Sequence, residues 1–321
     1  MRRPRSGSRA WREDAGALGL LAGAGPFDSP EFRRLWLRSF PAWRDVSYGA
    51  GRSDGTRAAV ALLAYGRETA ESIPFNYGGV VASKPLGPTE IERFLEAARR
   101  SAGVRRITVR SVPVLPVDGT RHTGGAVRGW TSVVYLGKGA ALESRFAQKA
   151  RRSIRIARAA GAEVIVTDEP DAFLDLYGGS AADHWLQYPD DLIQGLAREG
   201  AARFFDVQVE HARVSSVLAL TSRSHWMAWL AAQDETGRRV HGNYLAVSAV
   251  LKEAARSGIR AVDLGISHGL PPGVAHFKQR FDSVYVPVAE HRVSTASARL
   301  SDWARARRSR VVAAASRRLD S

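Results

Sequence analysis

Cysteine is absent from this chain of 321 residues. The absence excludes disulfides, a thiolate nucleophile and cysteine-ligated zinc, and it is compatible with the cytosol. Long apolar runs are also lacking, since no segment approaches the roughly 18 apolar residues that a membrane-spanning helix needs. The run from Ala15 to Gly25 is short and glycine-rich, and Glu13 and Asp14 interrupt the charged stretch before it. We therefore expect no export signal.

Several catalytic motifs are missing as well. The sequence contains no Gly-x-Ser-x-Gly nucleophile elbow and no Walker-type phosphate loop. No pair of histidine or carboxylate residues has metal-ligand spacing on one face with a third partner nearby. These absences argue against a serine hydrolase, a P-loop enzyme and a metal site.

Positive charge is abundant instead. The formal net charge is +15 and the isoelectric point is near 10.8. Such a balance favours a polyanionic partner, namely nucleic acid, a phosphorylated substrate or an anionic membrane surface. The alternative is that the charge serves solubility alone. With 45% hydrophobic residues, the chain can bury a sizeable core, in two domains or in one fold built twice.

One order of elements occurs twice along the chain. In the first half a strand at 57–67 leads through a glycine-rich turn to a helix at 87–103 and a strand at 105–112. In the second half, strands at 213–223 and 225–235 lead to a helix at 241–258 and a strand at 259–265. The helices share the wording "LEAARRSAGVRRITV" and "LKEAARSGIRAVDL". This repetition predicts a duplicated α/β module with Tyr77 and Tyr244 in corresponding turns, although similar helix composition could arise by chance.

A basic amphipathic helix is predicted between the two halves, within "ALESRFAQKARRSIRIARAAG". Apolar residues recur at helical spacing and arginines fill the other positions. Because nearly every charge has one sign, we expect contact with phosphate through Arg151, Arg152 and Arg155. The alternative is a solvated helix face.

Six stretches together resemble Fem-type transferases, which are tandem GNAT-fold aminoacyl and acyl transferases. They are "PFDSPEFRRLWLRSF", "SIPFNYGGV", "KARRSIRIARAAGAEV", "GNYLAVSAVL", "VDLGIS" and "FKQRFDS". The resemblance runs from about Phe27 to Val288 and implies an α/β (α+β) fold. Each of two GNAT-like modules would contain a mixed, mostly antiparallel sheet flanked by helices. One departure is Asp282, where the family usually has glycine. The long helical arm of some members is also missing.

Four segments follow from this interpretation. We expect a flexible N-terminus over residues 1–26 and a first module over residues 27–139. A second module would follow over residues 140–293, with the basic helix at its start. A basic C-terminal helix over residues 294–321 would contact tRNA or an anionic membrane, or remain a solvated, partly frayed end.

The turn "SIPFNYGG" carries candidate binding residues of the first module. In a GNAT-type sheet, neighbouring strands diverge to open a cleft. Gly78 and Gly79 would allow close backbone approach there, and Asn76 and Tyr77 would direct polar groups into the cleft. A plain structural turn is the alternative. Asn243 and Tyr244 form a similar pair in the second module.

The resemblance implies that Lys278 is the essential cation, acting on the oxyanion or on a phosphate, with Phe277 packed beneath the acceptor. For removal of a proton, the candidates are Asp263 at a strand end and His268, whose intrinsic pKa suits the task. Either residue could instead be structural. Trp185 and Tyr188 would cap the acceptor pocket or fill the core.

The absence of one sequence motif narrows the range of possible acyl donors. An acyl-CoA-dependent GNAT enzyme normally has a Gln/Arg-x-x-Gly-x-Gly/Ala loop that holds the pyrophosphate, and neither half contains it. We therefore expect no bound cofactor. Aminoacyl-tRNA would be the co-substrate, and its aminoacyl group would pass to an amine of a cell-wall precursor or secondary metabolite.

Two alternatives stay open. One is acyl-CoA-dependent N-acyl transfer to a sugar, lipid or polysaccharide precursor. The other is a non-catalytic relative that binds tRNA or polysaccharide. In each case we expect a cytoplasmic protein, with peripheral contact at the inner face of the membrane as a further option, and no stable protein partner.

Overall fold

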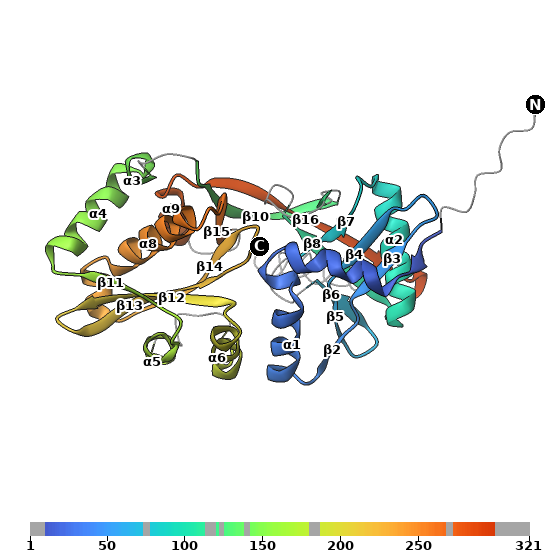
Figure 1. Ribbon diagram of the computed structural model, residues 1–321, viewed down its shortest axis with the longest axis horizontal. Coiled ribbons are helices and arrows are strands. Elements are labelled where there is room, and N and C mark those ends of the chain that lie inside the picture. The colour runs from blue at the N-terminus through green and yellow to red at the C-terminus, as the bar shows by residue number, and fades with distance from the viewer. Residues whose placement is uncertain are drawn as a thin grey trace, which may run out of the picture.

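The computed structural model describes residues 10–72, 78–112, 120–121, 125–137, 142–179, 187–267 and 272–298. Two α/β halves lie side by side and share one sheet (Figure 1). Eleven strands form this sheet in the order β11-β12-β13-β14-β15-β10-β16-β8-β6-β5-β2. A smaller sheet of five strands belongs to the first half alone, in the order β1-β3-β4-β7-β9. The mixed α/β architecture predicted from the sequence is confirmed.

The first module consists of short strands around one long helix. Its elements are β1 (Arg12–Glu13), η1 (Ala15–Gly23), η2 (Pro26–Asp28), α1 (Pro30–Ser39), β2 (Trp43–Asp45), β3 (Tyr48–Gly51), β4 (Arg57–Val60), β5 (Leu63–Tyr65), β6 (Thr69–Glu71), β7 (Val80–Ala82), α2 (Pro88–Ala102), β8 (Arg106–Ser111) and β9 (Thr120–Arg121).

Local sequence explains where the first helices begin and end. Ser29 is the N-cap of α1, and its hydroxyl accepts a hydrogen bond from the backbone N–H of Phe32 at 3.1 Å. Phe32 and Trp36 of this helix are buried. Helix α2 ends at Gly103, whose positive φ of 65° suits glycine.

The N-terminal segment packs more firmly than the sequence suggests. Strand β1 pairs with β3, and Ala17, Leu21 and Ala24 are buried in and around η1. Leu21 and Ala24 pack against the apolar side chains of β4 and β7. The expected flexibility of residues 1–26 is therefore wrong from residue 12 onward, because this segment completes the cover of the smaller sheet.

The second module has longer strands. Its elements are β10 (Ala126–Tyr135), α3 (Leu142–Arg145), α4 (Gln148–Ala159), β11 (Glu163–Thr167), α5 (Asp171–Gly179), α6 (Asp190–Arg198), β12 (Ala202–Val209), β13 (Ala212–Leu220), β14 (Trp226–Gln233), α7 (Glu235–Arg239), α8 (Gly242–Arg256), β15 (Ala261–Ile266), α9 (Pro272–Gln279) and β16 (Val284–Ser294).

Strands β10 and β16 connect the modules. Strand β10 pairs antiparallel with β15 on one side and with β16 on the other. Strand β16 then pairs with β8 of the first module. Strand β16, the last strand among the described residues, thus bridges both halves, and the sheet continues from one module to the other (Figure 1).

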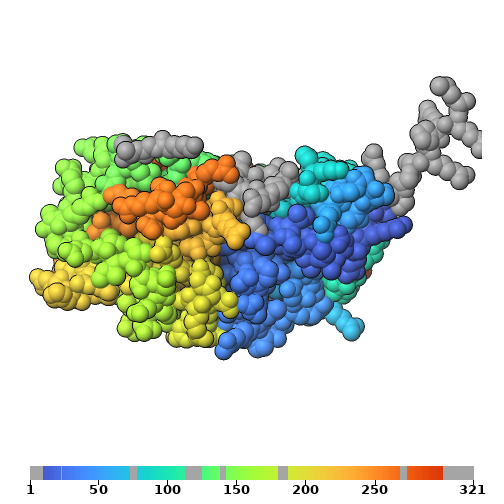
Figure 2. All heavy atoms as spheres, viewed as in Figure 1, coloured from blue at the N-terminus to red at the C-terminus, as the bar shows by residue number. Residues whose placement is uncertain are grey.

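Helices cover both faces of the shared sheet in the second module. Helices α5 and α6 lie on one face of the second module, and α4 and α8 lie on the other (Figure 1). Helix α1 of the first module packs beside α6. Figure 2 shows the blue first module and the yellow-green second module in contact along this boundary. An ion pair between Arg34 and Glu199 joins α1 to the end of α6 at 2.7 Å.

The predicted duplication is confirmed, with one difference. Helices α2 and α8 each contain 15 residues. Strand β15 after α8 runs parallel to β14, and β8 after α2 runs parallel to β6, but β7 of the smaller sheet lies between β6 and α2. Tyr244 lies in the first turn of α8, whereas β7 separates Tyr77 from α2. Tyr77 lies outside the described residues, so the expectation that these two tyrosines occupy corresponding turns stays a prediction.

Candidate active site

The parallel strands β14 and β15 pair over only two residues. Trp226 pairs with Val262 and Met227 pairs with Asp263, although both strands continue beyond these positions. Asp263 therefore stands at the point where the parallel pairing ends. Polar side chains at the diverging ends of parallel strands are a common setting for ligand sites.

Asp263 is completely buried, with 0% exposure. Its Oδ1 accepts a hydrogen bond from the Thr131 hydroxyl at 2.6 Å and another from the Gly265 backbone N–H at 2.7 Å. Thr131 belongs to β10, the neighbouring strand on the far side of β15. Two strands therefore hold the carboxyl group in one orientation.

Lys278 reaches the same position from α9. Its Nζ donates to the carbonyl oxygen of Ile266 at 2.7 Å and to that of Gly265 at 3.1 Å. These carbonyls lie at the end of β15, two and three residues after Asp263. The structure thus brings together two of the three catalytic candidates named from the sequence.

Burial shifts the pKa of both groups toward neutrality. Burial raises the pKa of Asp263 to about 7, opposed by the hydrogen bond from the Gly265 N–H and by the charge of Lys278. Burial lowers the pKa of Lys278 to about 8, opposed by the charge of Asp263. Perturbed pairs of this kind concentrate at functional sites. Between these values, both groups carry their charges.

Gly265 makes room for the lysine. Its φ of +85° is a conformation that other residues rarely adopt. A Cβ at this position would lie 3.6 Å from Lys278 Nζ and 3.5 Å from Met227 Cε. A side chain larger than methyl would therefore occupy the space of the ammonium group. Gly265 and Thr131 are site residues that sequence reasoning missed.

The turn after Lys278 forms despite its unusual residue. Asp282 has a φ of +60°, the left-handed region that favours glycine but also tolerates aspartate. Its carboxylate accepts a hydrogen bond from Arg145 Nε at 2.8 Å. The departure at this position therefore preserves the turn, and it adds a contact to α3.

Phe277 and Tyr244, both candidates from the sequence, meet beside the lysine. Their ring centroids lie 4.7 Å apart in an edge-to-face arrangement, and Phe281 packs against both. The guanidinium of Arg280 contacts the Tyr244 hydroxyl. Asn243, by contrast, accepts a hydrogen bond from the Ser215 hydroxyl at 2.6 Å, so its side-chain oxygen anchors α8 to β13.

The glycine pair of the first module lies near the boundary between the modules. A Cβ on Gly78 would stand 2.4 Å from Oδ1 of the buried Asp28, so only glycine fits there. Gly79 has a φ of +149°. The neighbouring Phe27 packs its ring against Trp229 of β14 at 5.9 Å. Asn76 and Tyr77 lie outside the described residues.

Tyr188 lies at the same boundary. Its ring centroid is 4.4 Å from that of Trp229 and 6.2 Å from that of Trp36 in α1. Tyr188 is buried where the two modules meet, so its surroundings are those of a core residue. Trp185 and His268 lie outside the described residues.

The cations of α4 divide into two groups. Arg151 donates to the carbonyl oxygens of Ser144 and Phe146 and so closes the end of α3. Lys149, Arg152 and Arg155 are exposed, and none of them forms an ion pair within the described part of the chain. All four side chains are exposed, but among the described residues Arg151 alone of the four has hydrogen-bond partners.

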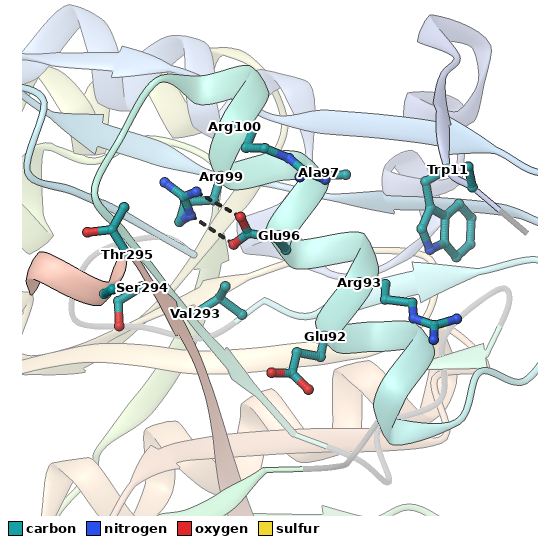
Figure 3. A pocket seen from close by; sticks show the side chains of 12 residues that line it. Trp11, Glu92, Arg93, Glu96, Ala97, Arg99, Arg100, Val293, Ser294 and Thr295 are labelled. Atoms are coloured by element: carbon teal, nitrogen blue, oxygen red, sulfur yellow. Dashed lines mark hydrogen bonds and ion pairs between the residues drawn. The ribbon is translucent and has the colours of Figure 1, made fainter. Parts of the chain in front are cut away.

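A separate hollow lies in the first module, between α2, the end of β16 and Trp11 (Figure 3). Its volume is about 690 Å³. Arg99 pairs with Glu96 across part of its wall at 2.8 Å. None of the residues predicted as site residues lines it, so we do not place the active site there.

Two other features bear on the class of site. Among the residues that the structure describes, no cluster of histidine and carboxylate side chains could hold a metal ion. Within the same residues, every helix is too short or too polar to cross a membrane.

Comparison with known proteins identifies the fold. Residues 144–279, which include Asp263 and Lys278, match the acetyltransferase (GNAT) domain family. A structure of FemX superposes with a TM-score of 0.63 at 13% identity, covering 87% of this chain and 94% of that one. A search of curated proteins finds no match.

Two further structures superpose on most of this chain. The C-terminal domain assigned to a lysylphosphatidylglycerol synthetase of Agrobacterium fabrum has a TM-score of 0.57 at 15% identity, with 89% of this chain and 95% of that chain covered. L-PGS from Bacillus licheniformis has a TM-score of 0.50 at 12% identity, with 88% and 93% covered. The chain therefore has a Fem-like tandem GNAT fold.

Proposed function

We propose that this protein is a transferase that forms an amide bond, moving an aminoacyl group from aminoacyl-tRNA to an amine. The acceptor would be a cell-wall precursor or a secondary metabolite. The observation that carries the proposal is the pair of Asp263 and Lys278 at the diverging ends of β14 and β15. The match of this module to an acetyltransferase family supports acyl transfer as the reaction class.

The chemistry needs little from the protein. The acceptor amine attacks the ester carbonyl, the C–N bond forms, the C–O bond to the donor breaks, and a proton of the amine goes to the departing ribose oxygen, which becomes a hydroxyl. No covalent enzyme intermediate is required, because the ester is already activated. The protein must place the two reactants and stabilise the oxyanion.

Lys278 is suited to stabilise that negative charge. An ammonium group has three N–H donors, and two of them reach the carbonyls of Gly265 and Ile266. The third can point to the oxyanion or to a phosphate of a substrate. Asp263 has no exposed surface, so we assign it to holding the charge and orientation of Lys278. His268 stays our candidate for the transfer of a proton.

The helix N-termini favour tRNA over coenzyme A as the donor. Between β14 and α8, where a pyrophosphate loop would lie, the chain forms the short helix α7. Gly242 at the start of α8 is buried, and a Cβ there would lie 2.7 Å from Ser215 Cβ. The start of α8 is therefore packed against β13. In the first module, the Glu90 carboxylate accepts from the Gly87 N–H at 2.9 Å. Such an acidic cap disfavours a phosphate.

The exposed cations of α4 give tRNA a surface. Lys149, Arg152 and Arg155 would contact its phosphates, and each contact releases counterions. The reaction would take place in the cytoplasm, with an acceptor that is either free or held at the inner face of the membrane. Acyl-CoA-dependent N-acyl transfer is the second candidate, favoured by the family name of the matching domain model.

A panel of donors tests the proposal. The protein would be incubated with charged tRNA pools and with acyl-CoAs, and mass spectrometry would measure the donor consumed. We expect consumption of an aminoacyl-tRNA. Consumption of an acyl-CoA alone would replace the first candidate by the second, and consumption of neither would contradict both.

Charge reversal on α4 tests the donor surface. In Arg152→Glu with Arg155→Glu, the salt slope of tRNA binding should fall by roughly one to two, because two phosphate contacts are lost. The matched control is Arg93→Glu with Arg100→Glu on the exposed side of α2. Equal losses in both double variants would show that tRNA responds only to net charge.

A further inference from the structure

Three arginines surround one glutamate where β10 and β16 of the second module meet β8 of the first in the shared sheet. The carboxylate of Glu290 in β16 lies 3.4 Å from Arg110 Nε, 3.6 Å from Arg128 Nε and 3.2 Å from Arg292 Nη2. Glu71 pairs with Arg110 at 3.0 Å. We call these five residues the Glu290 cluster. Three positive charges face two negative ones, so the cluster keeps an excess positive charge.

The two outer arginines of the cluster are accessible. The side chain of Arg128 is 61% exposed and that of Arg292 is 48% exposed, whereas Glu290 is 9% exposed. Both guanidinium groups approach the same oxygen, Glu290 Oε1. Each guanidinium has five N–H donors, so most donors of Arg128 and Arg292 remain available. A second anion between them would relieve the repulsion of the two cations.

Strand pairing places the cluster on the same sheet face as Asp263. Thr131, which donates to Asp263, pairs with Val286. Because side chains alternate along a strand, Val286, Val288 and Glu290 point to one face. Glu290 pairs in turn with Arg110 of β8.

Register also gives the spacing from the lysine. Ile266, whose carbonyl accepts from Lys278, pairs with Thr131 of β10. Arg128 lies three residues before Thr131, at the irregularity where β10 shifts register against β16, so roughly 10 Å of backbone, at about 3.3 Å per residue, separates the two residues. Strand β10 therefore links Thr131, the partner of Asp263, to Arg128 of the Glu290 cluster along one backbone.

We infer that the Glu290 cluster binds an anionic group of the acceptor, a phosphate or carboxylate about 10 Å from the amine that reacts near Lys278. This inference rests on the proposed function. It defines the acceptor class as an amine that carries a distant anion, with Arg128 and Arg292 as the direct contacts. Arg110 positions Glu290 through its ion pairs with Glu290 and Glu71.

Synthetic acceptors test the inference without any donor. The probes are ω-amino oligo(ethylene glycol) phosphates with one to five glycol units, and the matching amines that end in a methyl ether. Calorimetry would measure their dissociation constants. We expect the phosphates to bind about tenfold more tightly than the ethers, or better. Affinity should be highest where the spacer covers about 10 Å, because effective concentration peaks when linker and span agree.

Two arginine variants localise the contact. In Arg128→Gln with Arg292→Gln, the preference for phosphate should fall about tenfold, since two charge-assisted hydrogen bonds are lost. The control, Arg93→Gln with Arg100→Gln on α2, should keep the preference. Thermal unfolding would verify that both double variants fold. The inference is overturned by equal affinity for phosphates and ethers, or by the same loss in the control.

Other outcomes separate this inference from the proposed function. Tight, arginine-dependent phosphate binding without consumption of any donor would support the anion site but contradict the proposed transferase activity. Transfer to amines at a rate and affinity that a phosphate group does not improve would support the transferase activity but contradict the anion site. If Arg128→Gln with Arg292→Gln weakened tRNA binding but not probe binding, the cluster would belong to the tRNA surface and the inference would fail.

Discussion

Strands β8 and β15 occupy corresponding positions in the two modules, yet they carry different chemistry. Each follows a 15-residue helix and a glycine with positive φ, Gly103 or Gly258. Counting from these glycines, Thr108 of β8 corresponds to Asp263 of β15, and Arg110 corresponds to Gly265. Thr108 pairs with Glu71 in parallel register just as Asp263 pairs with Met227.

The difference bears on the proposed reaction, which we assign to the second module. In the first module, Arg110 fills its position and is neutralised by Glu71 and Glu290. In the second, glycine leaves the position empty of a side chain, and Lys278 enters from α9 beside a buried carboxyl group. A duplicated scaffold has thus kept its backbone, while one copy holds Arg110 between two carboxylates and the other holds Asp263 and Lys278 together.

The largest expected effect comes from Lys278→Met. Losing one preorganised donor to a developing oxyanion typically costs about 10²–10³-fold in turnover, and the methionine preserves length and apolar contact. The matched control in the first module is Lys84→Met, whose exposed ammonium donates only to the Asp54 carbonyl. Single-turnover rates measure both. If the Lys278→Met enzyme were as fast as the control, the claim that the reaction depends on Lys278 of the second module would be contradicted.

The second largest expected effect is the pH dependence of kcat/KM that Asp263 and Lys278 impose. Asp263 must be ionised, above about pH 7, and Lys278 must be protonated, below about pH 8. We therefore expect kcat/KM to peak between these values and to fall on both sides.

Asp263→Asn sharpens this test. The amide removes the negative charge that keeps Lys278 protonated, so the pKa of the ammonium group should fall and the alkaline limb should move to lower pH. At pH 8 we expect kcat/KM to drop by about tenfold, because a larger fraction of Lys278 is then neutral. Thr108→Val at the corresponding position of the first module should leave the profile unchanged. A profile that stays fixed in Asp263→Asn would show that the carboxyl group does not act through Lys278.

Gly265→Ala should have a moderate effect. A methyl group fits sterically, at 3.6 Å from Lys278 Nζ, but the positive φ costs on the order of 1–3 kcal/mol for a residue other than glycine. Gly103→Ala in the first module has a similar φ of +65° and open space around it. Urea unfolding should show a loss of stability in both variants, whereas turnover should fall only in Gly265→Ala.

The smallest effect is expected at Glu143, which joins α3 to α4 and α8. Burial would raise the pKa of Glu143, but hydrogen bonds from Arg158, Lys252 and Ser248 lower it to about 2. Because its folded pKa lies below the unfolded value of 4.5, this carboxylate stabilises the fold above pH 4.5 and loses that contribution as pH falls toward 2. Glu143→Gln should lower Tm by a few degrees at pH 6.

The same thermal scans at low pH provide the check on Glu143. The Tm difference between wild type and Glu143→Gln should shrink steadily from pH 5 to pH 2. Glu96→Gln in the first module, which removes an i,i+3 pair with Arg99, is the matched control and should give a smaller difference at pH 6. A constant difference across this range would mean that the variant acts through packing.

Much of the fold could be predicted from the sequence because the signals are local. Helix α1 begins after Ser29 and α4 buries Ala150, Ile154 and Ala157, as spacing and capping rules require. Resemblance and residue type also selected Asp263 and Lys278. The N-terminal segment was predicted wrongly, because a glycine-rich run carries no periodic signal and is ordered only by the sheet that it covers.

The sequence by itself determined the duplicated order of helices and strands and the excess of positive charge, since both depend on neighbours along the chain. Tertiary structure decided the roles of individual side chains. It joined Thr131 to Asp263 across 132 positions, and it gave Arg151 two backbone carbonyl partners, one in α3 and one directly after it. The physical reason is that hydrogen bonds, burial and the resulting pKa values depend on distance in space, which strand pairing between remote segments sets.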